Sequence, residues 1–158
     1  MKKLLLLIFS MVLLGLVGCT ALDSTSKEMR SSRLATVEFN FIPHKEGLIT
    51  YWYDAEITIT NKTDDVVEIL WNSSSVNGSP ILIEEQTMSN YGKLAPNTAL
   101  APYSSYNTII SSIKDSQVNG EFYKLGTIKK YPAKIVIKVK QGSTEEFIVL
   151  EVEKHEVK

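Results

Sequence analysis

Cysteine, histidine and glycine-rich motifs are scarce in this 158-residue chain, and their scarcity excludes several kinds of chemistry. Cys19 is the only cysteine, so the chain can form neither an internal disulfide nor a zinc–thiolate site. The two histidines, His44 and His155, have no second histidine or cysteine at metal-ligand spacing. No Gly-x-Ser-x-Gly elbow and no glycine-rich phosphate loop is present. The sequence therefore predicts a protein without metal or cofactor that is not an enzyme.

An excess of positive charge is also missing. The chain carries 17 basic and 18 acidic side chains, for a net charge of −1. Proteins that bind nucleic acid need a basic surface to neutralise phosphates, so this balance predicts no nucleic-acid partner. Beyond residue 18, no stretch repeats its apolar residues with the 3.6-residue period of an amphipathic helix.

The first 18 residues have the organisation of a secretory signal peptide. Lys2 and Lys3 form a positive start, an apolar run covers residues 4–17, and small residues follow. The apolar run is shorter than the roughly 20 residues that a helix needs to cross a bilayer. We therefore expect a cleaved signal rather than a membrane-spanning anchor.

The end of this segment, Leu16-Val17-Gly18-Cys19, resembles the lipobox of bacterial lipoproteins. The resemblance implies that diacylglycerol is joined to Cys19 by a thioether and that cleavage makes Cys19 the mature N-terminus. Two or more acyl chains would then hold the protein stably on a membrane. Thr20, in place of aspartate after the cysteine, implies the outer membrane of a Gram-negative host. In a Gram-positive host the same anchor implies the outer face of the cell membrane.

The remaining chain has the size of one domain. Residues 19–32 are polar and lack apolar periodicity, so we expect the lipidated cysteine and a flexible linker there, followed by one domain over residues 33–158. Cleavage after residue 18 would remove Lys2 and Lys3, leaving 15 basic and 18 acidic side chains.

Short stretches with a period of two predict that this domain is all-β. The clearest runs from Tyr51 to Thr60, and Pro43 is expected to end the strand before it, with a turn over residues 44–47. The other expected strands cover residues 37–41, 66–71, 81–83, 103–113, 121–125, 134–139 and 147–152. Asn77-Gly78, Asn119-Gly120 and Gln141-Gly142-Ser143 are turn signals, and residues 86–102 are expected to be a long loop.

This pattern predicts an immunoglobulin-like antiparallel β-sandwich of about seven strands, with a small β-barrel as the alternative. The strand end Ile57–Thr63, with Asn61-Lys62-Thr63, and the later Pro102-Tyr103-Ser104-Ser105 resemble features of bacterial immunoglobulin-like domains. That resemblance implies a fold and no activity.

Three aromatic residues are candidates for binding a partner. Trp52 alternates onto the polar face of its expected strand, so it is either an exposed interface anchor or is covered by the loop over residues 91–102. Tyr91 and Tyr103 lie in or beside that loop, where β scaffolds carry binding residues. Trp71 alternates with Val67 and Ile69 and is expected in the core.

These features predict a non-enzymatic lipoprotein of the bacterial cell envelope that acts as a binding or assembly module. Its expected partners are the membrane, through lipid on Cys19, and another envelope protein or a cell-wall glycan. Two alternatives remain open at this stage: an accessory envelope lipoprotein such as a phage exclusion protein, and an envelope hydrolase.

Overall fold

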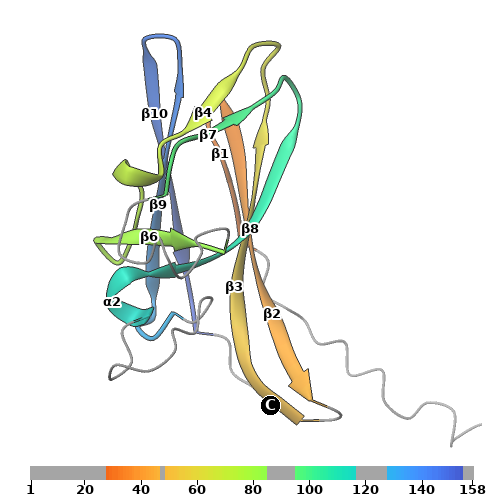
Figure 1. Cartoon of the computed structure of the whole chain (residues 1–158), viewed down its shortest axis with the longest axis vertical. Coiled ribbons are helices and arrows are strands. Elements are labelled where there is room, and N and C mark those ends of the chain that lie inside the picture. Colours follow the sequence, from red (N-terminus) through yellow and green to blue (C-terminus); the bar gives the residue numbers. More distant parts are fainter. Residues whose placement is uncertain (1–27, 47–48, 85–94, 117–127, 155–158) are drawn as a thin grey trace, which may run out of the picture.

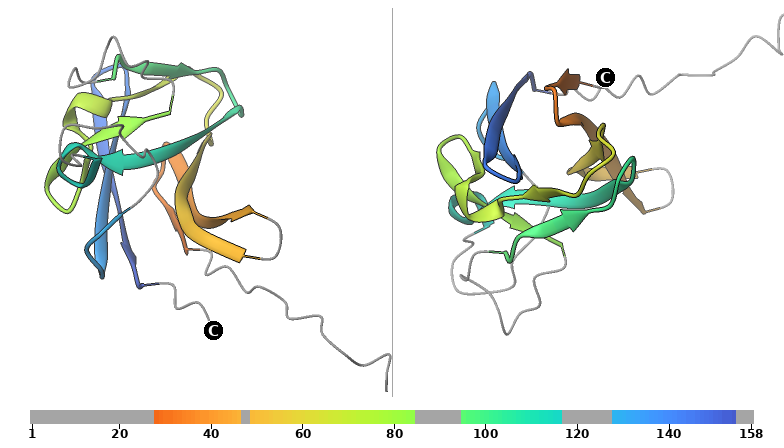
Figure 2. Two further views of the ribbon diagram at one scale, coloured as in Figure 1. Left: turned by 60° about the horizontal axis from the view of Figure 1, so that its bottom comes forward. Right: turned by 90° about the horizontal axis from the view of Figure 1, so that it is seen from above.

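The chain folds into antiparallel strands arranged in two layers (Figures 1 and 2). The computed structural model describes residues 28–46, 49–84, 95–116 and 128–154. The elements are β1 (Glu28–Ser31), β2 (Ala35–Glu46), β3 (Ile49–Asn61), β4 (Val67–Ile69), the 3-10 helix η1 (Trp71–Ser73), β5 (Ser75–Val76), β6 (Ser79–Ile83), β7 (Thr98–Leu100), β8 (Ser105–Ser112), α2 (Ile113–Ser116), β9 (Ala133–Gln141) and β10 (Thr144–Val152). The predicted all-β, sandwich-like fold is confirmed.

One ladder of paired strands runs through both layers. The first layer has the order β1-β2-β3-β8-β6, and β6 also pairs with β5, which belongs to the second layer. In the second layer, β10 pairs with one edge of β9. The other edge of β9 pairs with β5 near its start and with β4 near its end, and β4 pairs in addition with β7. On the side away from β6, β1 lies beside β10. The layers therefore meet along two seams.

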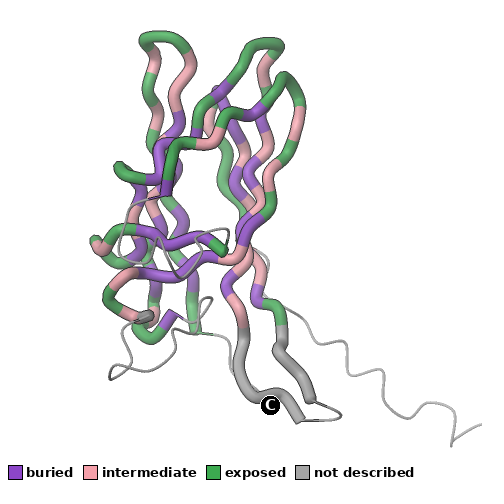
Figure 3. Tube along the Cα trace, in the orientation of Figure 1, coloured by how far each residue is buried: buried purple, intermediate pink, exposed green. Residues whose placement is uncertain are grey.

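The core lies between the layers and is built by strand alternation. Phe39 and Ile57 in the first layer belong to the same buried cluster as Ile137 and Leu150 in the second. Along β9, residues Ile135, Ile137 and Val139 are buried while the lysines between them reach solvent, so buried and exposed positions alternate along the trace (Figure 3). This is the pattern that a half-buried strand requires.

The folded region starts earlier than the sequence predicts. Residues 28–31, expected in the linker, form β1 and pair with residues 36–39 of β2. Glu28-Met29-Arg30-Ser31 has no apolar alternation, and three of its four residues are exposed. Backbone pairing with β2 and hydrogen bonds of the Ser31 hydroxyl with Thr36 and Lys62 hold it to the sheet. Together with the very short β5 and β7, this strand brings the number in the described part of the chain to ten, where about seven were expected.

The prediction that Pro43 ends its strand is wrong. β2 continues through Pro43, which lies opposite Tyr53, and reaches Glu46 after a register shift between His44 and Lys45. Among the described residues, β1 pairs only with residues 36–39 of β2, so β2 has one free edge at Pro43. Proline is tolerated on such an edge because its missing N–H leaves no gap in the ladder. His44 is consequently a strand residue rather than a turn residue.

Two of the predicted turns are confirmed. Asn77 and Gly78, with φ angles of 52° and 76°, connect β5 to β6 as the positive-φ hairpin turn that Asn-Gly favours. Gly142, with φ of 57°, lies in the turn between β9 and β10. The Asn119-Gly120 signal and the expected strand over residues 121–125 lie outside the described residues. The predicted loop over residues 86–102 contains β7 at its described end.

A carboxylate closes the seam between β1 and β10. The Leu34 N–H donates to Glu146 Oε2 at 3.0 Å, and Arg33 Nε donates to Glu146 Oε1 at 3.3 Å. Burial raises the pKa of the Glu146 carboxyl, but hydrogen bonds from Ser32, the Leu34 N–H and Arg33 outweigh it and hold that pKa below its usual value. The charged form of Glu146 therefore joins β10 to the segment before β2.

We expect this contact to make stability depend on pH. Because folding lowers the pKa of Glu146, its contribution is complete above about pH 4.5 and is lost as the pH falls through the folded-state value. Glu146→Gln should lower the free energy of unfolding by about 1 kcal/mol at neutral pH. The difference from the wild type should vanish in acid, as measured by urea unfolding over a pH series. Glu151→Gln, an exposed position on the same strand, controls for loss of charge. An unchanged neutral-pH stability of Glu146→Gln would contradict this role.

Candidate functional site

One end of the sandwich is organised around the buried side chain of Asn61, the last residue of β3. Asn61 Nδ2 donates to the carbonyl oxygens of Asp65, Leu100 and Ala101 at 2.7, 3.2 and 3.0 Å. Its Oδ1 accepts the Thr63 N–H at 2.8 Å, which shapes the turn after β3. We call the segments joined here, residues 61–65 and 101–104, the Asn61 end.

Tyr103 projects from the Asn61 end. The Ser104 N–H donates to the Ala101 carbonyl at 3.1 Å, which closes a four-residue turn with Pro102 second and Tyr103 third. Tyr103 has a φ of 55°, a conformation that such a Pro-led turn normally gives to glycine or asparagine. Its side chain is 69% exposed. A large aromatic group in a strained backbone position, and exposed, is the kind of feature found at binding sites.

The structure does not bring Trp52 and Tyr103 together. Trp52 lies in β3 opposite His44 of β2, and its side chain is outside what the structure describes. Thr60, eight residues further along β3, pairs with Ser105, close to Tyr103. At about 3.3 Å per strand residue, Trp52 and Tyr103 are about 26 Å apart along the sheet. Tyr91 lies outside the described residues. Trp52 and Tyr103 therefore lie toward opposite ends of β3.

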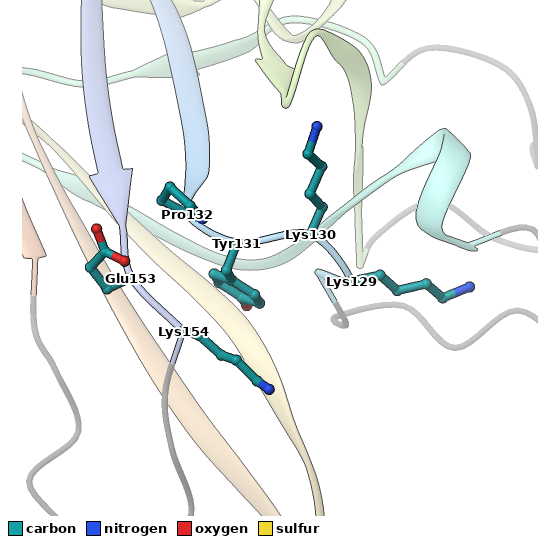
Figure 4. Close-up of a pocket in the computed structure, with 6 residues that line it drawn as sticks. All are labelled: Lys129, Lys130, Tyr131, Pro132, Glu153 and Lys154. Atoms are coloured by element: carbon teal, nitrogen blue, oxygen red, sulfur yellow. The ribbon is translucent and has the colours of Figure 1, made fainter.

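An open hollow of about 370 Å³ lies at the opposite end from Asn61. It is lined by Lys129, Lys130, Tyr131, Pro132, Glu153 and Lys154, from the segment before β9 and the residues after β10 (Figure 4). We call it the lysine hollow. Asn77 Nδ2 donates to the Lys130 carbonyl at 3.0 Å, so the β5–β6 hairpin holds its rim.

Tyr131 forms the floor of the lysine hollow and connects it to the core. Its ring lies 5.8 Å from that of Phe41 in β2, centre to centre. Burial, with the nearby Asp115 carboxylate, raises the pKa of the Tyr131 hydroxyl, so this group stays neutral at physiological pH. The lysine side chains extend from the floor in different directions (Figure 4). The hollow therefore spreads positive charge over a surface rather than focusing it on one small anion.

Sequence reasoning missed the lysine hollow. Lys129 and Lys130 are separated in the chain from Glu153 and Lys154, and only the pairing of Ala133 with Val152 brings the two pairs together. The adjacent Lys129-Lys130 was the one signal available in the sequence, and two lysines alone are too common to single out.

The described ranges contain no group of three or more His, Cys, Asp or Glu side chains placed to hold a metal ion. His155 is outside these ranges. Among the helices that the structure describes, none is both long and apolar enough to cross a bilayer.

No protein-family pattern, curated protein or solved structure matches the chain. The Asn61 end and the lysine hollow lie at opposite ends of the described sandwich.

Proposed function

We propose that this chain is a lipid-anchored lipoprotein of the bacterial cell envelope that acts as a non-enzymatic binding or assembly module. The lipobox-like Leu16-Val17-Gly18-Cys19 supports the anchor, and Thr20 supports the outer membrane if the host is Gram-negative. In a Gram-positive host the anchor would lie in the outer face of the cell membrane. The bound partner would be another envelope protein or a cell-wall glycan.

The observation that carries the binding role is the exposed Tyr103 at the Asn61 end. Tyrosine supplies a large amphipathic contact surface at low entropic cost, so it is a frequent anchor in protein interfaces and can also stack on sugar rings. The hydrogen bonds of Asn61 to Leu100 and Ala101 hold the turn that carries Tyr103. This end points away from the place where the chain enters the sandwich at Glu28, since β1 pairs Glu28 with Phe39 and Ser31 with Thr36. An anchored domain would thus present Tyr103 away from the membrane.

Photocrosslinking in intact cells tests the proposal. We expect a photoreactive phenylalanine analogue at position 103 to form one dominant adduct, with an envelope protein or with cell-wall glycan. The matched control is position 147, because Phe147 is also aromatic and is 60% exposed, but lies on the side of the sandwich in β10. Position 147 should give no such adduct. Equal adducts from both positions, or none from 103, would contradict a binding role for the Asn61 end.

Tyr103→Gly separates binding from folding. Glycine removes a left-handed backbone strain of about 1–2 kcal/mol, which stabilises the folded state. It also makes the unfolded chain more flexible, which destabilises the folded state by about 0.5–1 kcal/mol. The free energy of unfolding should therefore stay the same or rise slightly, while the partner contact is lost. Copurification of the crosslinked partner with the wild type and with Tyr103→Gly measures this. A variant that retains the partner in full would show that Tyr103 is not its anchor.

A further inference from the structure

The chain enters the sandwich nearer to the lysine hollow than to the Asn61 end. β1 runs antiparallel to β2, with Glu28 opposite Phe39, two residues before Phe41 and four residues after Ala35, which pairs with Asn61. β9 begins at Ala133 and β10 ends at Val152 on the same side, where Tyr131 packs against Phe41. Eight residues, 20–27, separate Cys19 from Glu28. Fully extended, this segment reaches at most about 30 Å. A lipid on Cys19 would therefore keep this end of the domain beside the bilayer.

The hairpin of β2 and β3 extends beyond the other strands at this same end (Figure 1). β3 pairs with β8 only over residues 55–60, and β2 pairs with β1 only over residues 36–39, within the described part of the chain. Among the residues that the structure describes, the strand partners of residues 42–46 are consequently residues 49–54. We call this paired segment the arm. It carries three consecutive aromatic residues, Tyr51-Trp52-Tyr53.

The arm and the lysine hollow together have the composition of a membrane-contacting surface. Tryptophan and tyrosine concentrate at the boundary between lipid tails and headgroups, because their rings are apolar and carry a polar group. Lysines at the same level attract anionic headgroups. The three lysines of the hollow stand against one acid, Glu153, although the whole chain has a net charge of −1. Positive charge is thus concentrated in the lining of the hollow itself, which a tether would hold near lipid.

We infer that the arm and the lysine hollow form a membrane-docking surface, with the Tyr51-Trp52-Tyr53 segment in the headgroup region and Lys129, Lys130 and Lys154 over anionic lipids. This inference rests on the proposed lipid anchor, and goes beyond it by fixing which end of the domain contacts the bilayer. The diverging lysine side chains favour a lipid surface over a single small anion, because a surface offers many separate headgroups (Figure 4). The domain would then stand on the membrane in one orientation, with the Asn61 end outward.

Tryptophan fluorescence can test this contact, because Trp52 and Trp71 are the only tryptophans and Trp71 is fully buried. The full-length chain, processed and lipidated, is reconstituted into vesicles of phosphatidylcholine and phosphatidylglycerol, with and without brominated acyl chains. We expect brominated lipid to lower the emission of the wild type. Trp52→Phe, which retains Trp71, should lose this quenching. Quenching of the wild type that persists in Trp52→Phe would overturn the inference.

A second variant tests the lysines. Changing Lys129, Lys130 and Lys154 together to glutamine should reduce the quenching in vesicles that contain phosphatidylglycerol and have little effect in pure phosphatidylcholine. Flotation of the vesicles separates the two proposals. A chain that floats with the vesicles but shows no quenching of Trp52 overturns only the docking surface. A chain that does not float overturns both the docking surface and the lipid anchor.

Discussion

Replacing Trp71 by alanine is expected to remove about 3–5 kcal/mol from the free energy of unfolding, the largest single effect in the domain. Trp71 is fully buried in the core, and its ring lies 6.1 Å from that of Tyr106 in β8, centre to centre. Its Nε1 donates to Thr98 Oγ1 at 2.9 Å, which ties η1 to β7. Alanine would leave a large cavity and an unpaired hydroxyl. Urea unfolding followed by circular dichroism measures the loss.

Two smaller changes separate the packing of Trp71 from its hydrogen bond. Trp71→Phe keeps most of the ring volume and loses the Nε1 donor, so it should cost less than half as much as alanine. Thr98→Val removes the acceptor alone and should cost about 1 kcal/mol. If Trp71→Ala cost no more than Thr98→Val, Trp71 would not be the packing centre that its burial indicates.

Replacing Asn61 by alanine is expected to cost about 2–4 kcal/mol, because several buried polar groups would lose their partner at once. The Asn61 side chain is 1% exposed and donates to the carbonyls of three residues, of which Leu100 precedes the Tyr103 turn and Ala101 begins it. Asn61→Asp should destabilise the domain at least as much, because it replaces the Nδ2 group that donates to these carbonyl oxygens with a negatively charged oxygen that repels them. Thermal and urea unfolding measure both variants.

A matched control for Asn61 is Asn72, which is exposed in η1. Asn72→Ala should change the free energy of unfolding by less than about 0.5 kcal/mol. Under conditions where the Asn61→Ala variant remains folded, the Asn61→Ala change should also weaken the crosslink from position 103, because the Tyr103 turn would lose its hydrogen bonds to Asn61. A stable Asn61→Ala variant with an unchanged crosslink would show that the Asn61 end does not depend on this side chain.

The strands that the sequence predicted best are those with one solvent-exposed face and one buried face. β3, β9 and β10 alternate so regularly that burial follows from position, and the two turns with Asn77-Gly78 and Gly142 follow from glycine and asparagine at positive φ. The expected core position of Trp71 is confirmed, although Trp71 lies in η1 and not in the strand expected over residues 66–71, because β4 ends at Ile69. Local pattern was sufficient wherever a single strand faces the core.

The features of the fold that could not be predicted from the sequence depend on pairing between segments that are distant in the chain. β1 has no apolar pattern of its own, and the continuation of β2 through Pro43 depends on a free strand edge that only the topology reveals. The separation of Trp52 from Tyr103 likewise follows from the direction of β3. The lysine hollow arises where the start of β9 meets the end of β10. None of these features leaves a signature within one short stretch of residues.

The anchor at Cys19 is the central claim, because it gives the two ends of the sandwich their proposed roles. Mass spectrometry of the N-terminal peptide, from the full-length sequence expressed in a bacterium and purified from its membranes, tests it most directly. We predict a peptide that begins at Cys19 and carries diacylglycerol on its sulfur, with Cys19→Ser recovered away from the membrane. A mature peptide that begins before Cys19, or a free Cys19 thiol in the membrane-bound protein, would contradict the account.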